Sequence, residues 1–458
     1  MSTRTTIRSN DATIDTAGLT TNAESEIRSP AEAGANGGNP KVLRPPKERA
    51  PKDGQSRGAS ADQLAGRVAR GGEDGRVPYA LHFENGASKF FGGEKPRFVV
   101  GVRDESEWER LLRSDAYSAA LAYVRGQVEV TGDIAAAIRF YSERCRPSLG
   151  RMLLTLAELY APSRLESWMQ SKGKAARNIR FHYDRSNGFY RQFLDSRMVY
   201  SCAYFDDGVA TLENAQVAKL EYICRKLRLT SGEKFLDIGC GWGALAMHAA
   251  AHGARATGCT LSPQQRVFAQ GRAAEEGLAD CVNVCERDYR DMRGTFDKIA
   301  SVGMVEHVGK RRLPEYFRKL HSLLADGGLV LNHGITRPKP VGDGADSVFI
   351  RRRVFPGGEL PNLSEVIGAA ENAGFEVLDV ENLRRHYART CAAWVQNLQA
   401  NETACLKHVD EQTFRTWVLF LAASGVDFAD GVLGLHQVLL CKRGHAGAQP
   451  MTRRYMYA

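Results

Sequence analysis

The stretch Phe235-Leu236-Asp237-Ile238-Gly239-Cys240-Gly241-Trp242-Gly243 decides the fold, because an apolar run ends in three glycines at alternate positions. The residues that follow, Ala244 to Ala250, are mostly small and apolar and are typical of a helix. Glycine allows the backbone to turn sharply and leaves it open to a ligand. The stretch therefore predicts a strand, a tight turn and a helix, the arrangement with which α/β folds hold a nucleotide-like cofactor.

Two kinds of cofactor fit this turn, a dinucleotide and S-adenosylmethionine, and the second predicted strand separates them. Gly239, Gly241 and Ala244 satisfy a loose dinucleotide pattern, which requires an acidic residue about twenty positions further on. The second strand ends instead in Thr260-Leu261-Ser262, which offers no carboxylate. Together with Asp237 inside the motif, this pattern favours an S-adenosylmethionine-dependent methyltransferase.

Composition limits the class of protein. The 458 residues are enough for two or three domains, and 43% hydrophobic residues are enough for a filled core. No apolar run approaches the about 18–20 residues of a membrane-spanning helix, and the polar first ten residues do not resemble a secretory signal. We therefore expect a cytoplasmic protein.

The net charge of +9 indicates an anionic partner, either nucleic acid or anionic lipid. The ten cysteines form no Cys-x-x-Cys pair, so we expect reduced thiols and no metal site.

Composition and periodicity divide the chain into four parts. Residues 1–76 are rich in Ser, Gly, Arg and Pro and poor in aromatic residues, which predicts a disordered basic tail. Short alternating and helical patterns over 77–165 predict a small α+β domain. Strand and helix alternate over 170–445, which predicts an α/β domain with a doubly wound, parallel, Rossmann-like sheet. Residues 446–458 are predicted to be a C-terminal tail.

The elements of the α/β domain are predicted from the same patterns. Its strands are expected near 234–238, 254–259, 281–286, 297–302, 328–334, 375–381 and 435–441. Its helices are expected near 215–227, 243–252, 263–277, 313–324, 364–373 and 392–401. The aromatic segments 182–190 and 198–205 follow no clear period and suit a cap over a pocket.

Several motifs together resemble the cyclopropane-fatty-acyl-phospholipid synthases and their relatives, the mycolic acid cyclopropane synthases. The resemblance covers about 170–445, and its motifs are His182-Tyr183-Asp184, Tyr200 to Phe205, Leu236 to Gly243, Thr260 to Ser262 with Gln265, Asp288 to Asp291, Ser301 to Gly309, and His333-Gly334-Ile335. It implies that a cis double bond of an unsaturated phospholipid acyl chain attacks the sulfonium methyl group of S-adenosylmethionine. Loss of a proton from the new methyl group then closes a cyclopropane ring.

The resemblance also implies the catalytic residues. A bound bicarbonate ion is expected to accept the proton, held by Cys202, Glu306, His333, Ile335 and Tyr387. His333 and Tyr387 offer side-chain donors, and Glu306 can accept the bicarbonate hydroxyl or orient His333. Apolar runs precede both Glu306 and His333, which predicts that each stands at a strand end, where ligands bind in such sheets.

The cofactor contacts implied by the resemblance surround the glycine turn. They are Tyr200, Ser201, Asp237, Gly239, Cys240, Gly241, Trp242, Gly243, Thr260, Leu261, Gln265, Asp288 and Tyr289. The glycines are expected to face the methionine part, and the later residues are expected to face the ribose and adenine. For Gln265, a solvated position in the first turn of a helix is an equally weighted alternative.

Two positions depart from the family pattern. Ser424 stands where family members commonly carry a cysteine, so a thiol nucleophile is absent there. Gly334 stands where a threonine is common, which is expected to loosen or reshape the bicarbonate pocket.

Several alternatives stay open. The product can instead be a methylene- or methyl-branched chain, and a small-molecule methyltransferase has the same fold. A nucleic-acid binder is disfavoured, because the positive charge is spread out.

We expect association with the inner face of the membrane. The segment Arg351 to Pro356 is a candidate lipid contact or a solvated loop, and a homodimer is one candidate assembly.

Overall fold

The computed structural model describes residues 77–144, 186–338, 349–350, 353–354, 359–445 and 449–457. Several predicted features lie outside these ranges, namely the basic tail, His182 to Asp184, the last part of the small domain, and all of the candidate lipid contact except Arg353 and Val354. None of the helices that the structure describes combines the length and the hydropathy of a membrane-spanning segment.

The larger of two sheets has seven strands in the order β10-β11-β9-β8-β5-β6-β7. They are β5 (Lys234–Ile238), β6 (Arg255–Thr260), β7 (Val282–Glu286), β8 (Phe296–Val302), β9 (Leu324–Thr336), β10 (Phe375–Asn382) and β11 (Gly434–Lys442). The strands from β9 to β7 are parallel, whereas β11 is antiparallel to both of its neighbours. The predicted doubly wound α/β fold is confirmed, and the sheet is mostly rather than entirely parallel.

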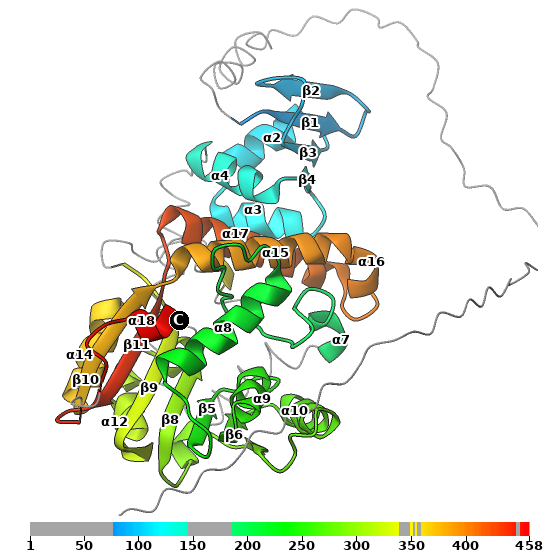
Figure 1. Ribbon diagram of the computed structural model, residues 1–458. Helices are drawn as coiled ribbons and strands as arrows, with labels where there is room; N and C mark the ends of the chain where they lie inside the picture. The colour runs from blue at the N-terminus through cyan, green and yellow to red at the C-terminus, as the bar shows by residue number, and fades with distance from the viewer. Residues whose placement is uncertain are drawn as a thin grey trace, which may run out of the picture. The chain divides into compact units, whose positions relative to one another are not determined.

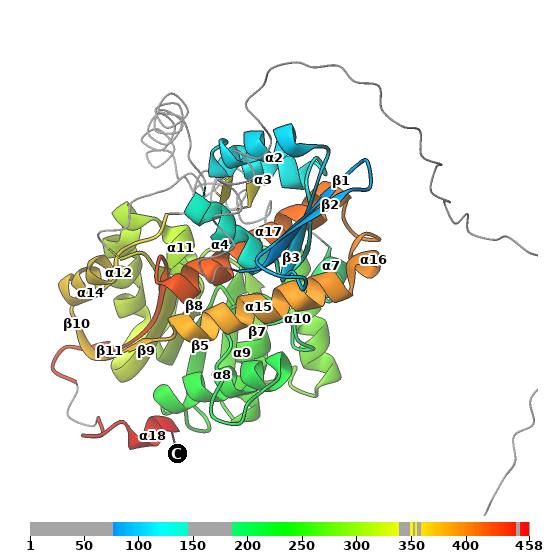
Figure 2. The same cartoon turned by 90° about the horizontal axis from the view of Figure 1, so that it is seen from above.

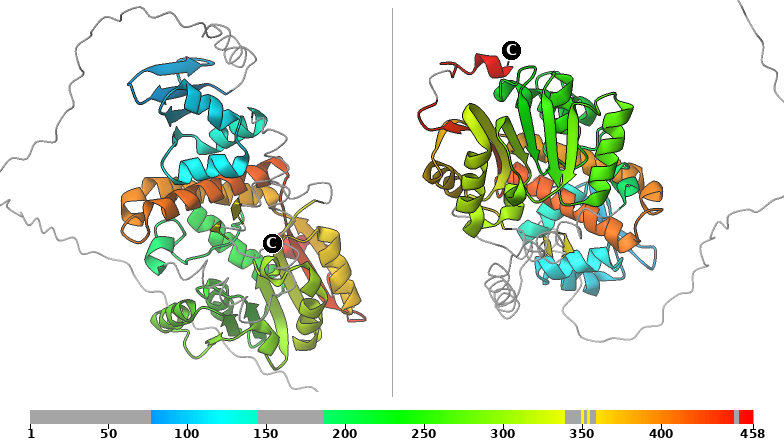
Figure 3. Two further views of the ribbon diagram at one scale, coloured as in Figure 1. Left: turned by 180° about the vertical axis from the view of Figure 1, so that it is seen from behind. Right: turned by 90° about the horizontal axis from the view of Figure 1, so that it is seen from below.

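Helices cover both faces of this sheet (Figures 1 and 3). On one face, α8 (Leu212–Lys226), α9 (Ala244–Ala251) and α10 (Pro263–Glu275) bury Phe235 of β5. On the other, α12 (Leu313–Leu323) and α14 (Leu363–Asn372) bury its neighbour Leu236. This alternation follows from the period of two along a strand and explains the continuous apolar runs in the sequence.

The strand order reverses at β5. From β5 the chain continues to β6 and β7 on one side and then crosses to β8 and β9 on the other. In open α/β sheets a crevice forms at such a reversal, outside the carboxyl ends of the strands. The glycine turn follows β5 directly and therefore lies at this crevice.

Two long helices, α15 (Arg384–Ala400) and α17 (Glu411–Asp430), pack side by side (Figures 1 and 2). Sequence periodicity predicts only the second half of α15 and misses α17. The carboxylate of Asp410 caps α17 by accepting a hydrogen bond from the backbone N–H of Thr413 at 2.7 Å. Trp394 and Trp417 are fully buried, so this helix pair belongs to the core.

The small domain has a four-stranded sheet of order β2-β1-β3-β4. Its elements are β1 (Tyr79–Phe83), β2 (Ser88–Phe91), β3 (Phe98–Val102), α2 (Glu105–Leu112), α3 (Ala116–Val124), β4 (Glu129–Gly132) and α4 (Ile134–Arg144). Ion pairs from Arg139 to Asp430 and from Arg415 to Glu129 join it to α17. Its residues Val124 and Ile134 belong to the same buried cluster as Trp417.

The C-terminal end of the chain packs onto the larger α/β domain. Helix α18 (Arg454–Tyr457) contacts α8, and Met456 is buried. The described residues of the predicted C-terminal tail are thus an ordered part of the fold.

Candidate active site

A pocket lies at the carboxyl ends of β5, β6 and β8, at the crevice where the strand order reverses. All but two of the predicted cofactor residues line it, namely Tyr200, Ser201, Asp237, Gly239, Cys240, Gly241, Trp242, Thr260, Leu261, Gln265 and Tyr289. These residues come from segments up to about ninety positions apart, so the fold gathers what the sequence motifs suggested separately. The pocket is the candidate cofactor site.

The last two glycines of the turn have different roles. Gly241 has a φ of +53°, and a Cβ atom built on it would meet no heavy atom within 4 Å, so its backbone stays open. Gly243 has a φ of +84° and caps α9. A Cβ atom at Gly243 would lie 2.9 Å from that of Ala269 on α10. Gly243 therefore permits close helix packing and does not line the pocket.

Asp288 is the other predicted contact that the pocket does not include. Its carboxylate accepts hydrogen bonds from Arg290, from Nε at 2.8 Å and from Nη2 at 2.6 Å. It also caps the short 3₁₀ helix η1 (Tyr289–Asp291). Asp288 thus shapes the turn that presents Tyr289 to the pocket.

Thr260 and Gln265 form a buried pair beside the pocket. The Thr260 hydroxyl donates to Gln265 Oε1 at 2.7 Å, and both residues are at most 5% exposed. Ser262 caps α10 through the backbone N–H of Gln265, with Pro263 in the first turn. The alternative of a solvated Gln265 is therefore wrong.

Lys219 is a pocket residue that the sequence motifs miss. It lies on the buried face of α8, and its ammonium donates to Ser201 Oγ at 2.9 Å. Burial lowers the pKa of Lys219 to about 8 and raises that of Asp237 to about 7, and the attraction between the two charges opposes both shifts. The sequence does carry a signal for Lys219, because this lysine lies among the residues that α8 buries, next to Leu220. The other lining residues that the motifs miss include Arg287, Met304 and His307.

Glu306 and His333 stand beside this pocket, each with one unpartnered polar atom. Glu306 lies in α11 (Val305–Val308), and its Oε1 accepts from the backbone N–H of Ile335 at 2.7 Å. His333 lies on β9, and its carbonyl accepts from the N–H of the lining residue Gly303 at 2.9 Å. Among the described residues, Glu306 Oε2 and His333 Nε2 are buried and have no hydrogen-bond partner.

The protonation of this pair follows from its burial. Desolvation raises the pKa of Glu306 to about 7 and lowers that of His333 to about 3, so His333 is neutral. Gln437 Nε2 faces His333 Nδ1 at 3.1 Å, and with the amide in this orientation Nδ1 accepts and the imidazole proton lies on Nε2. The N–H of His333 Nε2 is thus a buried donor without an acceptor, and Glu306 Oε2 is a buried acceptor without a donor. Leaving each of them unpaired costs about 1–3 kcal/mol of folding free energy. In kind, the two unmet atoms match an oxygen and the hydroxyl of bicarbonate, so His333 and Glu306 are the residues that could hold such an anion.

Cys202 and Tyr387, the other predicted anion contacts, meet at Leu383. Cys202 Sγ donates to the carbonyls of Ala203 at 3.2 Å and of Leu383 at 3.9 Å, and the backbone N–H of Tyr387 donates to the same Leu383 carbonyl. Burial raises the pKa of the Cys202 thiol, so it stays protonated. The Tyr387 ring stacks on Phe428 with centroids 4.5 Å apart.

A backbone path links these two residues to the pair formed by Glu306 and His333. The N–H of Leu383 donates to the carbonyl of Leu435 at 2.9 Å. Leu435 is paired with Ile335 across the ladder between β11 and β9. The predicted anion ligands thus come from neighbouring chain segments, and Ile335 and Leu383 connect them.

The structure gives a steric explanation for the glycine at position 334. A Cβ atom at this position would lie 2.2 Å from Val305 Cγ1 and 3.8 Å from Glu306 Oε1. The space that a threonine would need is therefore filled by Val305. Ser424, the second departure, is buried in α17.

Gly334→Thr is expected to destabilise the protein by about 1–3 kcal/mol, because it overpacks a filled site. Removing the obstructing methyl groups in Gly334→Thr/Val305→Ala should recover most of this loss. Urea unfolding followed by circular dichroism measures both effects. Equal stability of the single and double variants would show that Val305 is not the obstacle.

Comparison with known proteins shows the family of this chain. Residues 170–438 match the family described as mycolic acid cyclopropane synthetase. A probable fatty acid methyltransferase of Pseudomonas putida is 41% identical over 391 residues, covering 83% of this chain and 96% of that protein. The solved cyclopropane synthase MmaA2 from Mycobacterium tuberculosis is 31% identical with a TM-score of 0.57, over 58% of this chain and 98% of its own. Mycolic acid cyclopropane synthase CmaA1, solved with SAH and CTAB, is 33% identical with a TM-score of 0.56, over 58% of this chain and 98% of its own. The chain therefore belongs to the mycolic acid cyclopropane synthetase family of S-adenosylmethionine-dependent methyltransferases.

Proposed function

We propose that this protein adds a one-carbon unit from S-adenosylmethionine across the cis double bond of an unsaturated phospholipid acyl chain, forming a cyclopropane ring. The observation that carries the proposal is the buried pair Glu306 and His333, each with an unpartnered polar atom, beside the candidate cofactor pocket. The names of the similar proteins support it, since they include a fatty acid methyltransferase and cyclopropane synthases.

The reaction needs an electrophilic methyl group, a shielded cation and a proton acceptor. When bound, S-adenosylmethionine supplies the methyl group and bicarbonate supplies the acceptor. Tyr200 lines the pocket, and its ring packs against Tyr190 and Trp394 with centroids 5.5 and 5.1 Å apart. Such electron-rich faces stabilise a neighbouring cation without being methylated. Burial of the site also excludes water, which would otherwise capture the cation.

Glu306 and His333 are the residues that we assign to the proton acceptor. The N–H on His333 Nε2 can hold an anion oxygen, and Glu306 Oε2 can accept a hydroxyl hydrogen. Ile335 fixes the orientation of Glu306 through its backbone N–H. Cys202 and Tyr387, which both donate to the Leu383 carbonyl, are the other residues that we assign to the proposed anion site.

The proposed substrate places the protein at the inner surface of a membrane. The net charge of +9 supports attraction to anionic headgroups. Val354, in the candidate lipid contact, is buried, so the apolar part of that segment serves packing at this position. We therefore base membrane contact on the overall charge and the substrate class.

Purified protein incubated with unsaturated phospholipid vesicles and methyl-labelled S-adenosylmethionine should yield labelled acyl chains heavier by one CH2. Vesicles of saturated phospholipid are the matched control and should stay unlabelled, because they lack the double bond. Absence of label from the lipid of every unsaturated vesicle tested would contradict the proposal. Label in a soluble amine instead would favour a small-molecule methyltransferase.

A methylene- or methyl-branched acyl product is the second candidate. It is favoured by the 41% identity to a protein named as a fatty acid methyltransferase without mention of a ring. Because a ring and an exocyclic methylene have equal mass, the product must be distinguished by NMR. Cyclopropane protons resonate at high field, whereas a methylene group gives olefinic signals.

A further inference from the structure

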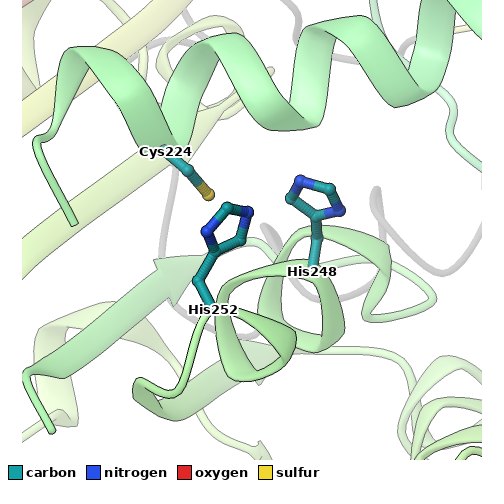
Figure 4. Close-up of side chains that lie close together, drawn as sticks. All are labelled: Cys224, His248 and His252. Carbon is teal, nitrogen blue, oxygen red and sulfur yellow. The ribbon is translucent and has the colours of Figure 1, made fainter. Parts of the chain in front are cut away.

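Three side chains that commonly bind metals lie together on α8 and α9, and none of them lines the cofactor pocket (Figure 4). Cys224 belongs to α8, His248 to α9, and His252 is the residue that caps the end of α9. One donor atom from each lies within 4.8 Å of the other two. The histidines are four positions apart, which brings them to one face of the helix, opposite Cys224.

Glu221 lies beside the two histidines of this cluster. Its Oε2 lies 3.2 Å from His248 Nε2 and 2.9 Å from His252 Nε2. Glu221 and Cys224 are three positions apart on α8, so both face α9. Arg225 pairs with the other carboxylate oxygen, Oε1, at 3.6 Å, which leaves Oε2 directed toward the histidines.

We propose that Cys224, His248 and His252 form a structural site for a zinc-like divalent cation, with Glu221 beside both histidines. One thiolate and two imidazoles are ligands that zinc prefers, and a water molecule or the neighbouring Glu221 carboxylate can take the fourth position. The thiolate and the carboxylate carry two negative charges, which neutralise the charge of the cation. Donor atoms around zinc are about 3.3–3.6 Å apart, given bond lengths of about 2.0–2.3 Å. The donor atoms of Cys224, His248 and His252, which lie within 4.8 Å of one another, therefore need to approach one another by at most about 1.2–1.5 Å.

The site is accessible and has a clear structural consequence. Cys224 is 3% exposed and the His252 side chain 36%, so the sulfur is shielded while a cation can enter from solvent. Helix α8 carries the pocket residue Lys219, and α9 begins directly after the glycine turn. A cation that links α8 to α9 would therefore stabilise the two helices that flank the cofactor turn. The competing interpretation is a carboxylate that only accepts hydrogen bonds from two imidazoles.

Cobalt titration of the full-length protein after chelator treatment tests the proposal, because Co²⁺ reports its ligands by absorption. We expect one equivalent to bind, with visible bands of a tetrahedral ion and a near-ultraviolet thiolate-to-cobalt charge-transfer band. Zinc should displace the cobalt and raise the melting temperature. Residues 1–76 contain neither histidine nor cysteine, so that segment does not compete through such ligands.

Variants separate a built site from adventitious binding. Cys224→Ser and His252→Gln should each weaken cobalt binding by about tenfold or more. The control substitutions Cys281→Ser and His445→Gln, at exposed positions, should leave it unchanged. Absence of saturable binding, or equal binding by His252→Gln and wild type, would overturn the proposal. So would visible bands without the thiolate charge-transfer band, which decides the matter even where Cys224→Ser fails to fold.

Discussion

Replacing Glu306 by glutamine is expected to lower methyl transfer to lipid by about 10²–10⁴-fold, the usual range for a lost proton-transfer function. Glutamine keeps an oxygen that can accept from the Ile335 N–H but removes the negative charge at Oε2. Cofactor affinity should change little, because Glu306 is not among the residues that line the cofactor pocket. Initial rates with unsaturated vesicles and calorimetric binding of S-adenosylmethionine measure the two quantities separately.

The same variant should become more stable relative to wild type as the pH rises. Burial raises the pKa of Glu306 from 4.5 to about 7, so its contribution to stability is fully present below pH 4.5 and is lost as pH rises through 7. Glutamine does not ionise, and each pKa unit corresponds to about 1.4 kcal/mol. At pH 8 the variant should therefore gain about 2–3 kcal/mol over its relative stability at pH 4.5. Urea unfolding at both pH values checks this, and a pH-independent difference, or near wild-type turnover, would refute the assignment.

Replacing Lys219 by methionine is expected to weaken S-adenosylmethionine binding by about 10–100-fold. The ammonium lines the pocket, donates to Ser201 at 2.9 Å and opposes the negative charge of buried Asp237. Methionine has a similar length but neither the charge nor the donors. Hydrogen bonds that involve a charged group contribute about 1.5–3 kcal/mol, which corresponds to this range of affinities. Isothermal calorimetry gives the affinity directly.

Lys226→Met is the matched control for this experiment. Lys226 is also a buried lysine of α8, but its ammonium pairs with Glu381 and lies 4.6 Å from the centroid of the Tyr222 ring, away from the pocket-lining residues. Its loss should reduce stability while cofactor affinity stays near that of wild type. If both variants lost affinity equally, Lys219 would act through the integrity of α8 and not through the pocket.

The sequence predicts most of the larger sheet because the buried strands carry continuous apolar runs bounded by glycine turns. It misses α17, whose residues Trp417 to Ala422 are apolar in succession and hide the period of a helix. It also misses the reversed direction of β11, since pairing direction depends on contacts far apart in the chain.

The site was predictable where a motif follows a strand and less so elsewhere. The glycine turn, Thr260 and Tyr289 line the pocket as expected, whereas Asp288 turns to Arg290, a local pairing that motif reading does not reveal. The position of Lys219 at the pocket, and that of Cys224 beside the two histidines, depend on how α8 packs against its neighbours, which no local motif encodes. The expectation of no metal site rests on the spacing of cysteines along the chain and stays a prediction, whereas the cluster of Cys224, His248 and His252 forms only when α8 packs on α9.

Helix α17 joins the small domain to the larger α/β domain through buried side chains. Because α17 contacts both α15 and the helices of the small domain, Val124 and Ile134 share one buried cluster with Trp417. Separating the small domain would expose apolar surface on both partners, at about 25 cal/mol for each Å². The described part of the small domain and the methyltransferase domain therefore share one buried core across α17, and separating them carries a cost in apolar exposure.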